Sequence, residues 1–83
     1  MKIVWDEPKR LLNIANHAMD FADLDVAFFR TAVFFPAKHR RLIAIGRLGN
    51  GVATVVFIML GTEALSVISM RPASRKERSR IDG

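Results

Sequence analysis

The chain has 83 residues, of which 51% are hydrophobic, and it contains no cysteine. This composition is typical of one small globular domain, residues 1–83, and it excludes disulfides, cysteine-ligated zinc and thiol catalysis. The longest apolar run, residues 52–60, is too short to cross a bilayer as a helix, and the opening MKIVWDEP turns acidic too early for a signal peptide. We therefore expect a soluble cytoplasmic protein with no membrane partner.

Charge is distributed unevenly along the chain. Residues 1–30 carry four basic and five acidic side chains, whereas residues 31–83 carry nine basic and three acidic ones. A positive field of this kind attracts polyanions, although a solvated basic surface would give the same pattern.

Two helices are predicted in the N-terminal third, after a short strand or extended arm at residues 2–5. Asp6 is the N-cap candidate of the first helix, which runs to about His17. Asp20 is the N-cap candidate of a second helix, which ends near Arg30.

The first helix has an apolar stripe and a polar face. Leu11, Ile14 and Ala18 follow helical spacing, which predicts that they pack against the core. The other face carries Asp6, Arg10, Asn13 and His17.

From residue 31 the periodicity changes to that of strands. Four apolar segments follow one another, at residues 31–35, 42–48, 52–60 and 63–70. The second and third flank Asn50-Gly51, the strongest two-residue hairpin signal. Short links between consecutive strands indicate an antiparallel meander. The predicted fold class is α+β: two N-terminal helices, a four-stranded antiparallel sheet and a C-terminal helix.

The segment MRPASRKERSR, residues 70–80, predicts a strand end followed by a helix. Pro72 interrupts the strand, and Ser74 with Glu77 matches the capping box of a new helix. This arrangement would hold Arg71 at the end of the strand, close to Arg75 and Arg78.

Metal and cofactor chemistry is not indicated. The two histidines are far apart, and the acidic residues lack the spacing of ligands, so we expect no metal and no cofactor. Gly46-x-x-Gly49-x-Gly51 lies between two strands, which favours a hairpin over a phosphate loop.

RNA cleavage is one reaction that needs no metal, because the 2′-hydroxyl is a built-in nucleophile. The protein must orient it, compensate the charge on the phosphate and move protons. Arg47 and Arg71 lie at the ends of predicted strands and suit a phosphate, since a guanidinium binds two oxygens at once. His17 could move a proton. The alternatives are a histidine that only interacts with the helix dipole and arginines that only solvate the surface.

Three segments carry a resemblance to a known family: IVWDEPKRLLNIANHAMDFADL, AIGRLGNG and, most specifically, ISMRPASRKER. Over nearly the whole chain they resemble the BrnT family of type II toxins, small RelE-like ribonucleases. The resemblance implies a RelE-like fold and an endoribonuclease toxin that stops translation. It also implies a cognate BrnA-type, DNA-binding antitoxin in a hetero-oligomer, with the ribosome as a candidate partner. The family's polar positions correspond here to Trp5, Asp6, Lys9, His17, Arg47, Arg71, Arg75, Glu77 and Arg78.

By this resemblance we expect Arg47 and Arg71 to stabilise the scissile phosphate and His17 to transfer a proton. The expected RNA contacts are Lys9, Arg10, Arg75 and Arg78. Because the capping box gives Glu77 a structural role, we do not expect it to be a catalytic base.

The chain departs from the family pattern at two positions. Asn16 replaces the usual Lys before the histidine, and Ala18 replaces the usual Gly after it. The first change removes a cation beside His17, and the second should shift the turn, because alanine tolerates a left-handed conformation poorly. The alternative function is therefore a weakly active or inactive module of the same fold that binds RNA or the antitoxin. A DNA-binding protein is a further alternative, although no helix-turn-helix is evident.

Overall fold

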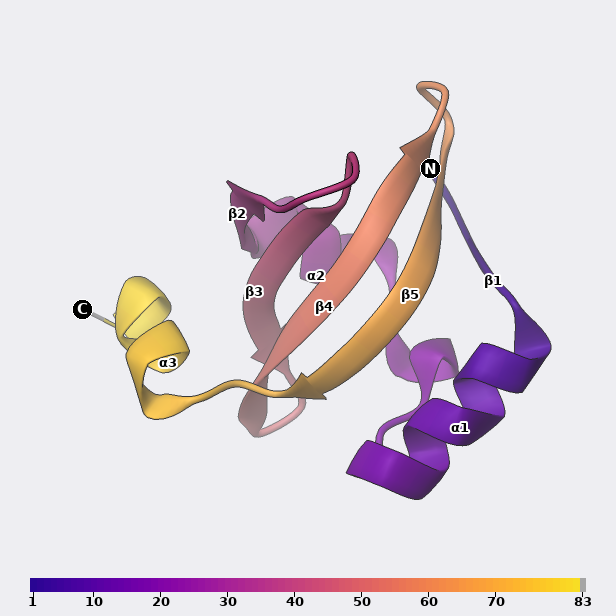
Figure 1. The fold of residues 1–83 in the computed structure, drawn as a ribbon. Helices are drawn as coiled ribbons and strands as arrows, with labels where there is room; N and C mark the ends of the chain where they lie inside the picture. The colour runs from indigo at the N-terminus through magenta and orange to yellow at the C-terminus, as the bar shows by residue number, and fades with distance from the viewer. Residues whose placement is uncertain (83) are drawn as a thin grey trace.

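The computed structural model describes residues 1–82, which form a five-stranded sheet with helices around it (Figure 1). In chain order the elements are β1 (Lys2–Trp5), α1 (Glu7–His17), the 3₁₀ helix η1 (Phe21–Asp23), α2 (Val26–Thr31), β2 (Val33–Pro36), β3 (Leu42–Leu48), β4 (Gly51–Leu60), β5 (Ala64–Pro72) and α3 (Arg75–Asp82). None of the helices within residues 1–82 is both long and apolar enough to cross a membrane.

The sheet has the order β1-β5-β4-β3-β2. Strands β2 to β5 form the predicted antiparallel meander, and the predicted hairpin joins β3 and β4. Its two-residue turn is Gly49-Asn50 and not Asn50-Gly51, because Gly51 already pairs with Leu48. The prediction of a purely antiparallel four-stranded sheet was incomplete, because β1 adds a fifth strand parallel to β5, from Lys2 opposite Ala64 to Trp5 opposite Val67. No local pattern encodes a partner about sixty residues away.

The second predicted helix is two shorter segments. An Asp20 carboxylate oxygen accepts a hydrogen bond from the Ala22 N–H at 2.9 Å, and an Asp25 oxygen accepts one from the Phe28 N–H at 2.8 Å. Each aspartate therefore caps its own segment, η1 or α2, with Leu24 extended between them. The expectation of one continuous helix from Asp20 to Arg30 was wrong.

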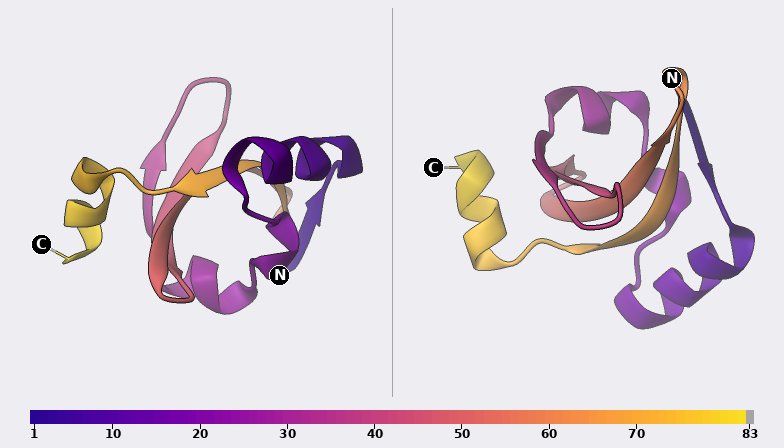
Figure 2. Two further views of the ribbon diagram at one scale, coloured as in Figure 1. Left: turned by 90° about the horizontal axis from the view of Figure 1, so that it is seen from below. Right: turned by 45° about the horizontal axis from the view of Figure 1, so that its top comes forward.

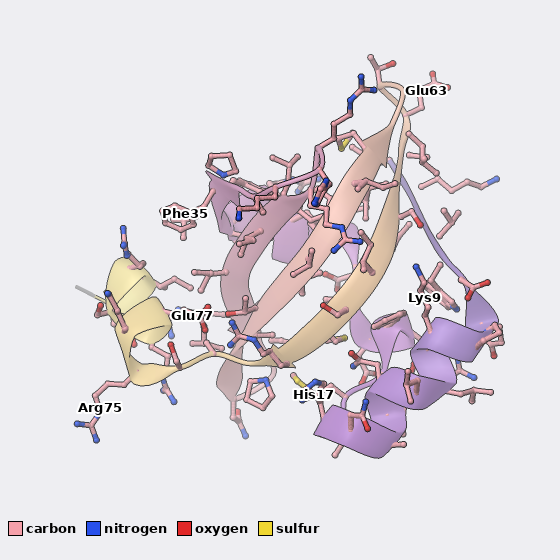
Figure 3. All side chains as sticks on the ribbon, in the orientation of Figure 1. Lys9, His17, Phe35, Glu63, Arg75 and Glu77 are labelled. Carbon is pink, nitrogen blue, oxygen red and sulfur yellow. The ribbon has the colours of Figure 1, made fainter. Side chains whose placement is uncertain are left out.

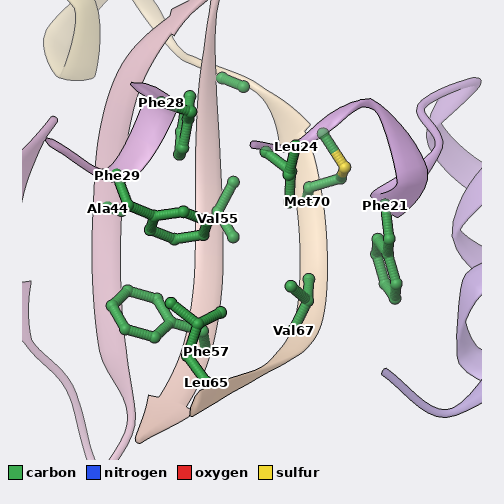
Figure 4. Packing of buried hydrophobic residues seen from close by; sticks show 11 residues of the cluster. Phe21, Leu24, Phe28, Phe29, Ala44, Val55, Phe57, Leu65, Val67 and Met70 are labelled. Carbon is green, nitrogen blue, oxygen red and sulfur yellow. The ribbon is translucent and has the colours of Figure 1, made fainter. Parts of the chain in front are cut away.

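The core lies between one face of the sheet and the η1–α2 segment (Figure 4). Phe29 makes edge-to-face contacts with Phe28 at 5.1 Å and with Phe57 at 5.3 Å between ring centroids. A Cβ atom at Gly46 would lie 2.8 Å from the Phe28 ring. Gly46 therefore allows α2 to pack closely on β3.

The buried face of α1 differs from the predicted one, and of the predicted apolar stripe only Ile14 is partly buried. Leu11 is 55% exposed, whereas Asn13 is only 5% exposed. Asn13 Oδ1 accepts a hydrogen bond from the Met70 N–H, and its Nδ2 donates one to the Met19 carbonyl, both at 3.0 Å. Asn13 turns inward because β1 pairs with β5 only as far as Val67, which leaves the Met70 N–H of β5 to be satisfied by α1.

The residue after α1 adopts a left-handed conformation. Ala18 has a φ of 55°, and its N–H donates to the Ile14 carbonyl at 2.8 Å. The turn therefore keeps the geometry that a glycine favours, and alanine does not redirect it as expected.

Strand β5 continues two residues past its predicted end at Met70, so that Arg71 lies opposite Thr54 and Pro72 opposite Ala53. The nitrogen of Pro72 points the same way as the Met70 N–H, toward the edge where no strand pairs, because residues two apart in a strand share an orientation. Proline there removes no ladder hydrogen bond.

Candidate functional site

The end of β5 and the start of α3 share one carboxylate. Both Nη atoms of Arg71 donate to the two Oε atoms of Glu77, each at 2.7 Å. The Ser74 N–H donates to Glu77 Oε1 at 2.8 Å, and the Glu77 N–H donates to Ser74 Oγ at 3.2 Å. The predicted capping box is confirmed, and its glutamate also binds the arginine that precedes it.

This pairing sets the charge state of both groups. The hydrogen bonds from Arg71, aided by the Ser74 N–H, lower the pKa of Glu77 to about 2. The same hydrogen bonds raise the pKa of Arg71. At neutral pH the site therefore holds a guanidinium and a carboxylate, with the carboxylate bound to both Nη atoms of the arginine.

A buried hydroxyl lies next to this pair. Thr54 is 2% exposed and lies directly opposite Arg71 in the β4–β5 ladder, so both side chains project from the same face of the sheet. The Thr54 hydroxyl helps to lower the pKa of Glu77, yet it makes no hydrogen bond of good geometry within residues 1–82.

The second arginine expected to stabilise phosphate also contacts an acid of α3. Arg47 Nη2, from β3, donates to Asp82 Oδ1. The two side chains are 64% and 45% exposed, so water screens this pair strongly. Both arginines to which the sequence assigned phosphate stabilisation thus engage a carboxylate of the same helix.

A small hollow of about 180 Å³ separates α3 from the sheet. Ile43 and Ile45 form its floor, on the face of β3 opposite the core residue Ala44. Phe35 lines one side, and the Arg80 guanidinium lies 5.1 Å from the centroid of its ring. Glu77 lines this hollow too, so the hollow adjoins the Arg71 pair.

A second hollow, of about 270 Å³, lies between α1 and β5. It is lined by Lys9, Leu12, Asn13, Asn16, His17, Ile68 and Ser69. In Figure 3, His17 lies at one side of the end of β5 and Glu77 at the other. The structure therefore places Lys9 and His17 together on the opposite side of the strand from α3, in a hollow that neither Arg47 nor Arg71 lines.

Arg10 does not contribute to either hollow. Its guanidinium donates to both Glu7 oxygens at 2.7 and 2.8 Å and to Asp20 at 3.0 Å, and Glu7 also accepts from Trp5 Nε1 at 3.0 Å. The hydrogen bonds from Arg10, and secondarily from Trp5, lower the pKa of Glu7 to about 2. Arg10 therefore joins α1 to η1. A structural role accounts for these hydrogen bonds better than the expected contact with RNA does.

Arg75 and Arg78 lie on α3, where they share a shallow hollow with Ala73, Ser79 and Asp82. No ion pair involves either arginine within residues 1–82. Across the same described part of the chain, no three histidine or carboxylate side chains gather closely enough to hold a metal ion.

Sequence reasoning missed three participants of the site. Asp82, Thr54 and Asn13 come from elements distant in the chain from their partners. The Ser74–Glu77 motif was visible in the sequence, but the contact of Glu77 with Arg71 was not, because it depends on how the chain turns after Pro72.

Comparison with known proteins identifies the family. The family described as "Ribonuclease toxin, BrnT, of type II toxin-antitoxin system" matches residues 5–77. The crystal structure of the Brucella abortus ribonuclease toxin, BrnT, superposes with a TM-score of 0.85 at 58% identity, covering 90% of this chain and 99% of that one. A search of curated proteins finds no match. The chain therefore belongs to the BrnT family of ribonuclease toxins of type II toxin–antitoxin systems.

Proposed function

We propose that this toxin is a metal-independent endoribonuclease that cleaves mRNA in the cytoplasm, stops translation and is neutralised by a BrnA-type antitoxin. The observation that carries the proposal is the geometry of Arg71. Its two Nη atoms already bind both oxygens of a carboxylate, which is the arrangement that suits two oxygens of a phosphate.

In the proposed reaction, the 2′-oxygen attacks the adjacent phosphorus while the bond from phosphorus to the 5′-oxygen breaks. Arg71 and Arg47 stabilise the negative charge that develops on the phosphate oxygens. Two protons move, one from the 2′-hydroxyl and one to the departing 5′-oxygen; His17 transfers one of them, and solvent water exchanges the other. The products are a 2′,3′-cyclic phosphate and a 5′-hydroxyl, and Lys9, Arg75 and Arg78 contact the flanking RNA.

Cleavage of an RNA oligonucleotide by purified toxin, in the presence of a chelator, tests this proposal. Arg71→Ala should slow cleavage by about 10²–10³-fold, since an electrostatic contact to the reacting phosphate is lost. Arg41→Ala is the matched control, because it removes one exposed arginine from the β2–β3 loop. Cleavage of a strand with deoxyribose at the scissile position would contradict attack by the 2′-hydroxyl.

The alternative is a module that binds RNA or the antitoxin but cleaves poorly. Asn16 favours it, because this position lines the hollow beside His17 and Lys9, where the family pattern has a lysine. If this alternative holds, wild-type toxin binds RNA without cutting it, and Asn16→Lys restores cleavage. Growth arrest on induction that is relieved by Arg71→Ala would favour the active toxin.

An apolar groove offers the antitoxin a docking surface. Phe34 and Met59 are 48% and 39% exposed there, and Arg30 is the charged residue on its wall. The other lining residues are Met1, Val26, Phe29, Leu42, Phe57 and Leu65. This surface fits an antitoxin segment that combines apolar side chains with a carboxylate opposite Arg30.

Antitoxin bound in the groove should raise the melting temperature of the toxin. Met59→Glu should weaken binding, because it places a charge among apolar groups, whereas Leu11→Glu on exposed α1 should not. An unchanged affinity for Met59→Glu, in a variant that still folds, would place the antitoxin elsewhere.

A further inference from the structure

Helix α3 is attached to the rest of the protein mainly by polar contacts. It has no buried residue, and Figure 2 shows it standing beside the sheet, away from α1. Its contacts are the Arg71–Glu77 and Arg47–Asp82 ion pairs and the stacking of Arg80 on Phe35. The half-buried Ile81 adds a limited apolar contribution.

These two ion pairs occupy the groups that RNA needs. While both Nη atoms of Arg71 hold the two oxygens of Glu77, that end of the guanidinium is closed to a phosphate, and the Glu77 charge repels a phosphate at the remaining Nε edge. Asp82 engages Arg47 through one hydrogen bond, which Arg47 Nη2 donates, and places a second negative charge beside a phosphate-binding arginine. Resting on the proposed function, we propose that α3 is a displaceable cover whose two carboxylates occupy the phosphate-binding arginines, and that single-stranded RNA displaces it.

The connection before α3 places the hinge. The Ala73 N–H donates to the Val52 carbonyl at 2.9 Å, so the chain is anchored to β4 up to that residue. Within residues 1–82, the next N–H, of Ser74, donates only to the Glu77 side chain. When Glu77 leaves Arg71, α3 can therefore swing from Ser74 onward without breaking the sheet.

Displacement of α3 also uncovers a surface that suits RNA. Arg80 leaves the face of Phe35, and the apolar hollow over Ile43 and Ile45 opens. A nucleobase can stack on an exposed aromatic ring as the guanidinium does, while its phosphate takes the position of the Glu77 carboxylate. The Thr54 hydroxyl, which lacks a hydrogen bond, lies beside that position and can donate to a phosphate oxygen.

Removal of the two carboxylates tests the cover. We would measure the affinity of the toxin, free of antitoxin, for a fluorescent single-stranded RNA made uncleavable by 2′-O-methylation. The double variant Glu77→Gln, Asp82→Asn should bind RNA about fivefold more tightly than wild type. In this variant RNA no longer has to displace a carboxylate from Arg71 and Arg47, and an exposed ion pair is worth about this much. Asp82→Asn alone leaves the capping box intact and should also bind the RNA more tightly than wild type. This single variant therefore tests the proposal if Glu77→Gln fails to fold.

Glu63→Gln is the matched control, because it removes one negative charge at the tip of the β4–β5 hairpin, far from α3 (Figure 3). The double variant removes two charges and the control removes one, so the gain in RNA affinity is compared per charge removed. That gain should be larger for the double variant than for Glu63→Gln. Equal gains per charge would show that net charge alone is responsible and would overturn the proposal.

Hydrogen exchange of the α3 amides distinguishes a displaceable cover from a helix with a purely structural role. A purely structural helix would not exchange faster when RNA binds. Addition of the RNA to wild-type toxin should speed exchange of the amides of residues 75–82, and slowed or unchanged exchange would overturn the cover. If wild type cleaves RNA in an Arg71-dependent way while these results are negative, the cover is wrong and the proposed function stands. If no variant binds or cleaves RNA, the proposed function itself is wrong.

Discussion

Helices α1 and α3 flank the same end of β5, yet they are attached by different physics. Helix α1 is tied to the strand by Asn13, whose amide is buried and bonded on both sides. Helix α3 is tied by ion pairs, and the side chains of Arg71 and Glu77 remain 45% and 22% exposed. A buried polar group is costly to leave unpaired, whereas water readily replaces an exposed ion pair. The contrast indicates that α1 belongs to the rigid fold and that α3 can be released.

The largest effect should come from the buried amide of α1. Asn13→Leu leaves the Met70 N–H and the Met19 carbonyl without partners, and it should lower the free energy of unfolding by about 1–3 kcal/mol. Urea denaturation measures this loss. Asn13→Asp is the informative companion, because it keeps the acceptor for Met70 but loses the donor to Met19. A loss below about 0.5 kcal/mol for the leucine variant would remove the contrast between the two helices.

The acid that binds Arg71 should produce a smaller, pH-dependent effect. The pKa of Glu77 is about 2 in the folded protein and has an ordinary value of 4.5, so its stabilisation is complete above pH 4.5 and is lost as the pH falls through 2. Because the pair is partly exposed, we expect about 1 kcal/mol or less.

The measurement for Glu77 is the difference in the free energy of unfolding between wild type and Glu77→Gln across that pH range. The difference should shrink toward low pH. A constant difference would mean that the side chain acts only as a helix cap and that its charge contributes little.

A small gain should come from the turn after α1. Ala18 has a φ of 55°, a conformation that glycine adopts without strain. Ala18→Gly should therefore raise the free energy of unfolding by roughly 0.5 kcal/mol, the relief of strain exceeding the entropy that glycine loses. Thermal denaturation can detect this gain, and the neighbouring Ala15→Gly, inside the helix, should instead destabilise. A loss for Ala18→Gly would show that the turn is unstrained.

The smallest effect on stability should come from Asp82 at the far end of α3. Its pair with Arg47 is exposed on both sides, so Asp82→Asn should change the free energy of unfolding by less than about 0.5 kcal/mol. The same variant should nevertheless alter RNA affinity. A global destabilisation above 1 kcal/mol would show that α3 is integral to the fold, as α1 is.

Local signals in the sequence predicted local structure well. The β3–β4 hairpin, the strand at residues 42–48 and the capping box at Ser74 and Glu77 are confirmed, because each depends on backbone geometry within a few residues. The hairpin turn lies one residue earlier than the predicted Asn50-Gly51, at Gly49-Asn50. The three quoted segments also identified the family correctly.

Other expectations failed where a distant partner outweighed a local pattern. The apolar stripe that includes Leu11 predicted the buried face of α1. Instead Asn13 is buried, because its amide oxygen accepts a hydrogen bond from the Met70 N–H, which has no strand partner on that side of β5. Asp25 divided the second helix, since it offered a second cap that competes with helix continuation.

The sequence by itself determined the α+β class, the meander with its β3–β4 hairpin, the capping box of α3, and membership of a ribonuclease toxin family, because these follow from residue periodicity and short motifs. Only the tertiary structure decided that β1 pairs parallel to β5, that Asn13 is buried, and that Arg47 and Arg71 face Asp82 and Glu77. The physical reason is that hydrogen bonds and ion pairs between distant segments depend on which backbone groups and charges the folded chain leaves unsatisfied, and no local pattern records that.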